Sequence, residues 1–190
     1  VELDLTPVRR RVDDVVTEEL AEDAAEAAGE YVRRRGFVSA GELTPLDETY
    51  VAATELRYAA EEIARGPRVG DREELDFLER LRGADVGGRA DPEDVPPSLR
   101  ESYGLAMMAA VEAFQRDLRR YLEDHPNPEG RRLGGRIRDQ RKRIEALDGD
   151  VDPADAHRLV RAARDLGKYV NGDDNAYVTA DNWLEGISEA

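Results

Sequence analysis

The chain has 190 residues, of which 43 are acidic and 28 are basic, so its formal net charge is −15. It contains no cysteine, which excludes disulfides, thiolate nucleophiles and cysteine-based metal sites. The longest uncharged apolar run, Tyr103 to Val111, is far shorter than the roughly 20 residues that a membrane span needs.

The length predicts a single domain over residues 1–190, and the apolar periodicity described below makes it helical. Its core must be mainly aliphatic and rich in alanine, because the chain holds only three phenylalanines and one tryptophan. No signal-peptide pattern opens the chain, so we expect a cytoplasmic location. The first residue is Val1 rather than methionine, which is what we expect of a trimmed N-terminus.

The basic residues are almost all arginine, since Lys142 and Lys168 are the only lysines. Abundant aspartate and glutamate with scarce lysine resemble the composition of proteins from salt-accumulating halophiles, in which compact carboxylates hold water and maintain solubility. At 1 M salt the Debye length is about 3 Å, so surface ion pairs would contribute little to stability. In dilute salt the acidic residues would repel one another and destabilise the fold.

The first predicted helix runs from about Pro7 to Arg35, with Thr6 as its N-cap. Its apolar positions recur every three to five residues, which indicates one buried stripe. These positions are Val8, Val12, Val15, Val16, Leu20, Ala24, Ala27, Ala28 and Tyr31. Because the second half of the stripe is alanine, this helix makes a shallow core unless another helix covers it.

A short extended piece is predicted at residues 37–38, before a second helix that starts at Thr44. Thr44 would cap this helix, with Pro45 at its first position and Asp47 in the capping box. The helix must end at residues 65–67, because a proline restricts the residue before it.

A third helix is predicted over residues 71–82, and a loop rich in glycine and proline follows over residues 83–97. This loop is the best candidate for a mobile connection. A fourth helix over residues 97–124 carries the clearest apolar stripe. The motif HPNPEG ends it, and a basic segment then leads into a helix over residues 136–147.

The next helix is predicted to begin at Asp152–Pro153 and to end at Val170. Residues 171–190 form a C-terminal appendage, with a short extended piece at residues 176–178 and a final short helix that carries Trp183. The fold class is therefore all-α: a bundle of long antiparallel helices with shorter peripheral helices and negligible sheet.

One segment opposes the acidity of the chain, because residues 131–143 carry seven cations and a single carboxylate, Asp139. The cations are Arg131, Arg132, Arg136, Arg138, Arg141, Lys142 and Arg143. We favour the interpretation that these cations balance charge by lying beside acidic helix faces such as residues 17–30 or 46–55. The balance would act within the chain or across a subunit interface. The alternatives are a surface for an acidic partner, where Gly134–Gly135 would allow close backbone approach, and a nucleic-acid site.

The sequence contains no motif typical of a catalytic, cofactor or metal site. Neither His125 nor His157 has a partner at the helical spacing of metal ligands, so we expect both at the polar surface. The aspartate-rich run from Asp148 fails as an EF-hand loop, because its sixth and twelfth positions are Pro153 and Leu159. We therefore expect no bound cofactor and no metal.

Trp183 is the only tryptophan in the chain. A single tryptophan on a short terminal helix is expected to dock that helix onto the body of the protein. The alternative is an anchor at an interface with another chain, since tryptophan is enriched at interaction hot spots.

The sequence favours a non-catalytic helical protein that acts through protein–protein contact. Self-association into a homo-oligomer is the leading form of this hypothesis, because the alanine-lined first helix needs a cover; another protein is the second candidate partner, and no membrane contact is expected. The alternative function is nucleic-acid binding through residues 131–143. A helix-turn-helix over residues 37–57 is disfavoured, because its recognition helix would open with the apolar and acidic residues 46–48.

Overall fold

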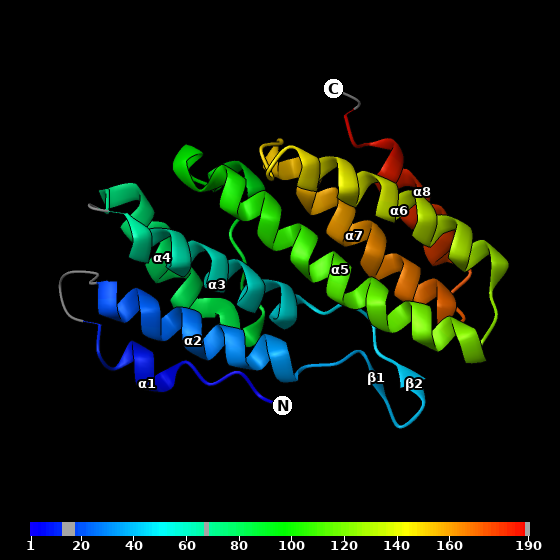
Figure 1. Ribbon diagram of the computed structural model, residues 1–190, viewed down its shortest axis with the longest axis horizontal. Coiled ribbons are helices and arrows are strands. Elements are labelled where there is room, and N and C mark those ends of the chain that lie inside the picture. The colour runs from blue at the N-terminus through cyan, green and yellow to red at the C-terminus, as the bar shows by residue number, and fades with distance from the viewer. Residues whose placement is uncertain (13–17, 67–68, 189–190) are drawn as a thin grey trace.

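The computed structural model describes residues 1–12, 18–66 and 69–188 (Figure 1). Within these ranges the protein consists of α-helices, short 3-10 turns and one two-stranded hairpin, so the all-α prediction is confirmed. None of the helices in the described ranges combines the length and the apolarity needed to cross a membrane.

Two helices replace the single helix predicted over residues 7–35, so that prediction is wrong. α1 covers Thr6–Arg9 and α2 covers Glu18–Arg34. Two residues of the predicted apolar stripe, Val15 and Val16, lie outside the described residues.

The last residue of α1, Arg9, binds another part of the protein. The Nε atom of Arg9 donates to the carbonyl oxygen of Leu81 at 2.8 Å, and its Nη2 atom donates to that of Arg82 at 2.9 Å. The same guanidinium pairs with Asp85, with 2.5 Å between Nη2 and Oδ1. These contacts attach the start of the chain to residues 81–85.

The alanine face of α2 packs against α3, which covers Glu48–Arg65. Ala21, Ala24 and Ala28 are fully buried. Since these side chains are short, the two helix backbones can approach closely. The shallow face that suggested self-association is therefore covered within the chain.

A short antiparallel hairpin connects α2 to α3, with β1 at Val38–Ser39 and β2 at Glu42–Leu43. Its turn places Ala40 and Gly41 in the left-handed region, at φ values of 52° and 80°. Of the extended piece predicted at residues 37–38, Val38 lies in β1 and Phe37 immediately precedes it.

The cap of α3 is Asp47, whose Oδ1 accepts a hydrogen bond from the backbone N–H of Tyr50 at 2.8 Å. The prediction that Thr44 caps this helix is wrong. The hydroxyl of Thr44 instead donates to the carbonyl oxygen of Phe37 at 3.2 Å, at the base of the hairpin. The helix therefore starts later than the sequence pattern indicated.

α4 covers Asp71–Gly83, in agreement with the helix predicted there. Three 3-10 turns follow it: η1 at Ala84–Val86, η2 at Pro92–Asp94 and η3 at Pro97–Leu99. The connection over residues 83–97 is packed against the body, because Ala84 and Val95 are buried and the Arg89 side chain is only 7% exposed.

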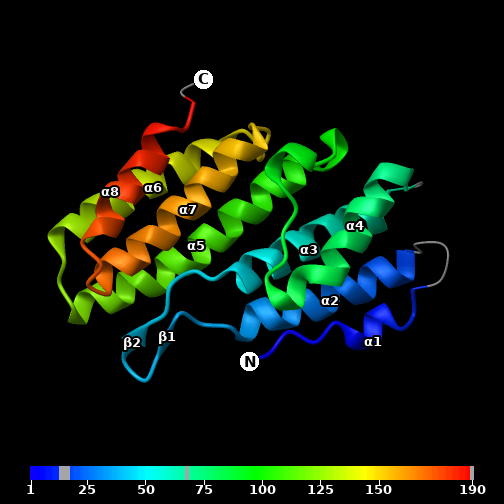
Figure 2. The ribbon, with the colours of Figure 1, turned by 180° about the vertical axis from the view of Figure 1, so that it is seen from behind.

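α5, at Arg100–Asp124, is followed by α6 at Pro128–Ala146, α7 at Pro153–Val170 and α8 at Asn175–Glu185. Figures 1 and 2 show α5 in the middle of the protein, with α2, α3 and α4 on one side and α6, α7 and α8 on the other. Its contacts with α3 and with α7 join the two groups.

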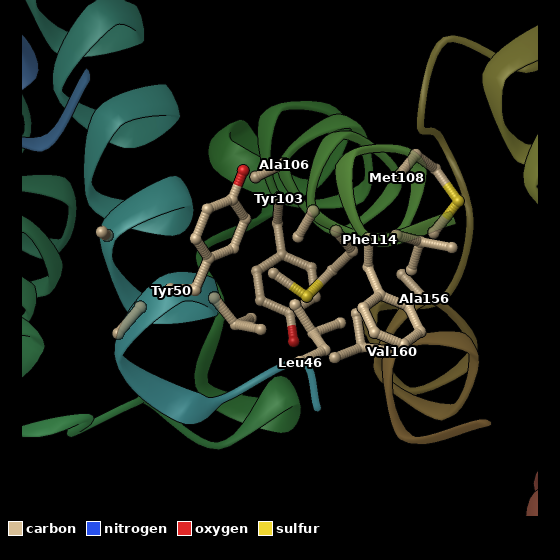
Figure 3. Close-up of a cluster of buried hydrophobic side chains, with 14 of the residues drawn as sticks. Leu46, Tyr50, Tyr103, Ala106, Met108, Phe114, Ala156 and Val160 are labelled. Carbon is tan, nitrogen blue, oxygen red and sulfur yellow. The ribbon is translucent and has the colours of Figure 1, made fainter. Parts of the chain in front are cut away.

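The core around α5 combines aromatic and aliphatic side chains (Figure 3). The rings of Phe114 and Phe37 pack edge to face with 5.4 Å between their centroids, and Phe37 packs in the same way on Tyr50 at 4.8 Å. Figure 3 shows Tyr50 of α3, Phe114 of α5 and Val160 of α7 in one cluster. One continuous core therefore connects the two groups of helices.

α6 begins at Pro128, well before the start predicted at Arg136. The side chain of Asn127 caps it by accepting from the backbone N–H of Gly130 at 2.9 Å, and Pro128 occupies the first helical position. Gly134–Gly135 therefore lies inside the helix, and the whole basic segment is helical.

α7 starts as predicted, with Asp152 as its cap: Oδ1 accepts from the backbone N–H of Ala154 at 2.9 Å. The extended piece predicted at residues 176–178 is wrong, because these residues belong to α8. Three buried residues of α8 follow helical spacing and pack toward α7, which favours the helix. They are Ala176, Ala180 and Leu184.

Candidate functional site

The seven cations predicted as an interaction patch all lie on α6, but only one is buried. The side chain of Arg141 is 9% exposed. Its Nη1 atom lies 2.7 Å from Oε1 of Glu145 and 3.8 Å from Oε1 of Glu112, and its Nε atom donates to Oε1 of Gln115 at 3.3 Å. Arg141 therefore balances charge inside the protein and connects α6 to α5.

Two further cations of the patch connect α6 to the C-terminal part of the chain. Arg136 pairs with Asp181 of α8. The Nη2 atom of Arg143 donates to the carbonyl oxygen of Ser188 at 3.1 Å, just beyond α8. Both arginines therefore hold the region that the sequence suggested as an appendage.

Arg131 and Arg132 have local partners. The Nη2 atom of Arg131 donates to the carbonyl oxygen of Leu122 at 3.0 Å, in the last turns of α5, where the negative end of the helix dipole favours a cation. Arg132 lies 3.4 Å from Glu129 on its own helix, and its side chain is 70% exposed. Such an exposed pair contributes little to stability.

The carboxylates that pair with this segment differ from the expected ones. They come from Glu112, Glu129, Glu145 and Asp181. Within the described ranges, the acidic faces at residues 17–30 and 46–55 supply no partner to α6. The reason is position, because α5 lies between α6 and the helices that carry those faces (Figure 1).

The side chains of Arg138 and Lys142 are exposed and form no hydrogen bond or ion pair within the part of the chain that the structure describes. Arg138 lines a hollow of about 240 Å³ between α5 and α6, which we call the α5–α6 groove. Its lining includes Leu118, Arg119, Leu122, Arg131, Gly134, Gly135 and Arg138. Arg119, from the α5 side, likewise has no partner among the described residues.

Two glycines in the interior of α6 border this groove. A Cβ added at Gly135 would meet no atom within 4 Å, and one added at Gly134 would meet only Cδ2 of Leu166, at 3.7 Å. A glycine inside a helix costs about 1 kcal/mol relative to alanine. Among the described residues, no contact requires either position to be so small.

Trp183 docks α8 onto α7. Its indole N–H donates to Oδ2 of Asp165 at 3.0 Å, and its ring is half-buried against the core. Lys168 lies 3.6 Å from the same carboxylate. The observed contacts correspond to the docking role, and they leave only part of the ring available to another chain.

The sequence did not reveal a buried network of charges between α3 and α4. Glu55, Asp76 and Arg80 are each at most 6% exposed. The Nη1 atom of Arg80 lies 2.5 Å from Oε2 of Glu55, and its Nε atom lies 2.8 Å from Oδ2 of Asp76. Arg89 pairs with the other oxygen of Glu55 at 2.6 Å. Buried charges are tolerated only when paired in this way.

The hydroxyl of Tyr103 is buried close to this network. It has no hydrogen-bond partner among the described residues, and burial raises its pKa. The guanidinium of Arg80 lies 5.9 Å from the centroid of the Tyr103 ring, which is a favourable cation–π position.

Arg89 connects the buried network to a polar pocket of about 560 Å³, which we call the Glu48 pocket. Glu48 receives three arginines: Arg89 at 3.1 Å, Arg161 at 3.0 Å, and Arg164. Burial opposes ionisation of Glu48, but the arginines outweigh it and hold its pKa below the ordinary value. The pocket lies between the start of α3, the connection before α5 and α7.

The prediction that both histidines lie at the polar surface is half wrong. His125 is exposed and stacks on Tyr121, with 4.1 Å between ring centroids. His157 instead lines the Glu48 pocket between two arginines: Nε2 lies 3.3 Å from Nε of Arg161, and Nδ1 lies 3.4 Å from Nη2 of Arg89. Burial and these two cations lower the pKa of His157 to about 4.

Across residues 1–12, 18–66 and 69–188, no cluster of three or more histidine, aspartate or glutamate side chains is arranged to hold a metal ion. The aspartates after α6 serve the turn and the cap of α7 instead.

A comparison with protein-family models matches residues 1–184 to the family described as "Family of unknown function (DUF7117)". The chain belongs to this family. No curated protein and no solved structure shows significant similarity to the chain. The family description carries no activity, so the site must be interpreted from its own chemistry.

Proposed function

We propose that the protein acts through protein–protein contact, without catalysis, and that the α5–α6 groove receives an acidic helix of its partner. The observation that carries the proposal is a pair of arginines without partners in the described chain, Arg119 and Arg138, at a groove bordered by helix-interior glycines. Lys142 extends the same face of α6 by one turn.

The occupant that we propose is α2 of a second copy of this chain, which makes the protein a homo-oligomer. The exposed glutamates Glu18, Glu22 and Glu26 give α2 an acidic outer face, and Glu22 and Glu26 have no partner among the described residues. This charge complementarity replaces the uncovered alanine face as the reason for self-association. Because groove and helix are different surfaces, the contact is heterologous and propagates around a ring or along a chain of copies.

The same proposal includes a cytoplasm of high salt as the working solvent. At a Debye length of about 3 Å, only charges in direct contact attract one another effectively. A glycine-bordered groove suits this solvent, because it lets a partner backbone approach until arginine and glutamate side chains touch.

Size-exclusion chromatography with light scattering in multimolar KCl tests the proposal. We expect the wild-type chain to exceed the mass of a monomer at micromolar concentration. A variant with Arg119→Gln and Arg138→Gln should be monomeric, whereas Arg132→Gln, an exposed arginine of α6 outside the groove, should behave as wild type. A wild-type protein that stays strictly monomeric contradicts self-association.

Nucleic-acid binding through residues 131–143 is the competing proposal. It is weakened by the contacts of Arg131, Arg136, Arg141 and Arg143, which are occupied with other parts of the chain. It predicts binding of duplex DNA that falls with added salt. It also predicts that the variant with Arg119→Gln and Arg138→Gln loses DNA binding without any change in oligomeric mass.

A further inference from the structure

The Glu48 pocket contains more hydrogen-bond donors than acceptors. Its charged lining consists of Arg89, Arg161 and Arg164 against Glu48 and Asp91. The Nε donor of Arg89 already pairs with Glu55 of the buried network. The side chain of Asp91 accepts a hydrogen bond from the backbone N–H of Glu93 in η2. Glu48 is therefore the carboxylate shared by all three guanidinium groups.

The two arginines of α7 keep most of their donors free within the described structure. A guanidinium has five N–H donors. Arg161 uses one nitrogen for Glu48 and one for His157, and Arg164 uses one for Glu48. Their side chains are 33% and 28% exposed, so a ligand in the pocket can reach them.

The position of His157 shows the same excess of donors. Each ring nitrogen of His157 lies beside an arginine N–H group, Nε2 beside Arg161 and Nδ1 beside Arg89. A neutral imidazole accepts at one nitrogen and donates at the other. In either tautomer, one ring N–H of His157 therefore points toward a donor and lacks an acceptor.

We infer that the Glu48 pocket is a binding site for a phosphate monoester of a small molecule. A phosphate group brings three terminal oxygens, and arginine forks bind such oxyanions through charge-assisted hydrogen bonds. One phosphate would give acceptors to the free N–H donors of Arg161 and Arg164. The pocket volume of about 560 Å³ lies in the range of small-ligand sites.

Glu48 acts as the internal competitor for this phosphate. In the structure its carboxylate occupies donors of all three arginines, so the ligand must share or displace those contacts. Removing the charge with Glu48→Gln should therefore tighten phosphate binding. Removing a donor with Arg161→Gln or Arg164→Gln should weaken binding by roughly 10- to 100-fold, the value of one hydrogen bond to a charged group.

Proton NMR of the two histidine rings tests the inference, with inorganic phosphate and glycerol 3-phosphate as probes in KCl solution. His157 reports on the pocket. His125, which is exposed just after the C-terminal end of α5, is the internal control. We expect a saturable shift of the His157 resonance with both probes and no matching shift of His125. Equal, unsaturable shifts of the two rings would overturn the site.

Two further comparisons make the result specific. Succinate, a dicarboxylate of similar size, should bind more weakly than glycerol 3-phosphate; equal or stronger binding overturns the phosphate assignment. Glu48→Gln should bind phosphate more tightly at an unchanged circular-dichroism spectrum. Weaker binding by a folded Glu48→Gln protein would show that Glu48 supports the ligand rather than competes with it, and would contradict the inference.

Discussion

Gly104 of α5 and Gly149 of the turn after α6 meet backbone to backbone. A Cβ built on Gly104 would lie 2.1 Å from the carbonyl oxygen of Gly149. Gly149 itself has a φ of 78°, in the left-handed region that favours glycine. This contact packs the turn between α6 and α7 against the first turns of α5.

Gly104→Ala should lower the free energy of unfolding by about 2 to 3 kcal/mol, because the added methyl group overlaps backbone that cannot move independently. Chemical denaturation in multimolar KCl measures this loss. A change smaller than that of an ordinary surface substitution would show that the two segments separate at little cost.

Gly135→Ala should have the opposite effect, since the added Cβ meets open space. We expect a gain in the free energy of unfolding of about 0.5 to 1 kcal/mol, from helix propensity alone. The methyl group would project into the α5–α6 groove, so the same variant should self-associate less than wild type. A stabilised variant with unchanged oligomeric mass would contradict the role of the α5–α6 groove in self-association.

Arg80→Met should lower the free energy of unfolding by about 3 to 5 kcal/mol, because it leaves Asp76 buried without its cation and leaves Glu55 with Arg89 alone. Adding Glu55→Gln and Asp76→Asn should recover part of this loss. Thermal unfolding of the single and triple variants, with Arg132→Gln as the surface control, measures both effects. A single variant as stable as the control would contradict the role of the network.

His157 should make stability depend on pH. Its pKa is about 4 in the folded protein against an ordinary value of 6.5, so the unfolded chain takes up a proton that the folded chain does not. The contribution of neutral His157 is complete above pH 6.5 and declines as the pH falls toward 4. Because the ring is half-exposed, we expect a loss of roughly 1 to 2 kcal/mol.

The measurement is the difference in unfolding free energy between wild type and His157→Gln across that pH range, since it cancels the titration of the carboxylates. The difference should shrink on acidification. A difference that stays constant with pH would contradict the lowered pKa of His157.

Strong periodicity is what made parts of this fold predictable. The helices at residues 97–124 and 153–170 have apolar residues at steps of three and four, and the structure places helices there. The prediction of a single helix over residues 7–35 is wrong, because α1 ends at Arg9, and the side chain of Arg9 binds residues that follow much later in the chain.

The predicted start of α6 at Arg136 was too late. Asn127 and Pro128 supply a strong start, and Leu133, Ile137 and Ile144 bury one face. Helix formation by the flanking residues therefore outweighs the propensity cost of two glycines.

The Glu48 pocket was not predictable from local pattern. Its residues come from the start of α3, the connection before α5 and the middle of α7, and only tertiary packing brings them together. A partial signal existed in Glu55, a charged residue on the buried face of α3 between Ala52 and Ala59. A carboxylate in such a position requires a buried cation, which the structure supplies from Arg80 and Arg89.

The central claim is that the α5–α6 groove of one copy binds α2 of the next, and charge reversal tests it most directly. One variant carries Arg119→Glu and Arg138→Glu in the groove, and the other carries Glu22→Arg and Glu26→Arg on α2. Light scattering in KCl should find each variant monomeric alone and an equimolar mixture associated, because reversed groove then meets reversed helix. A mixture that stays monomeric beside an associating wild type, or variants that associate alone, would contradict the account.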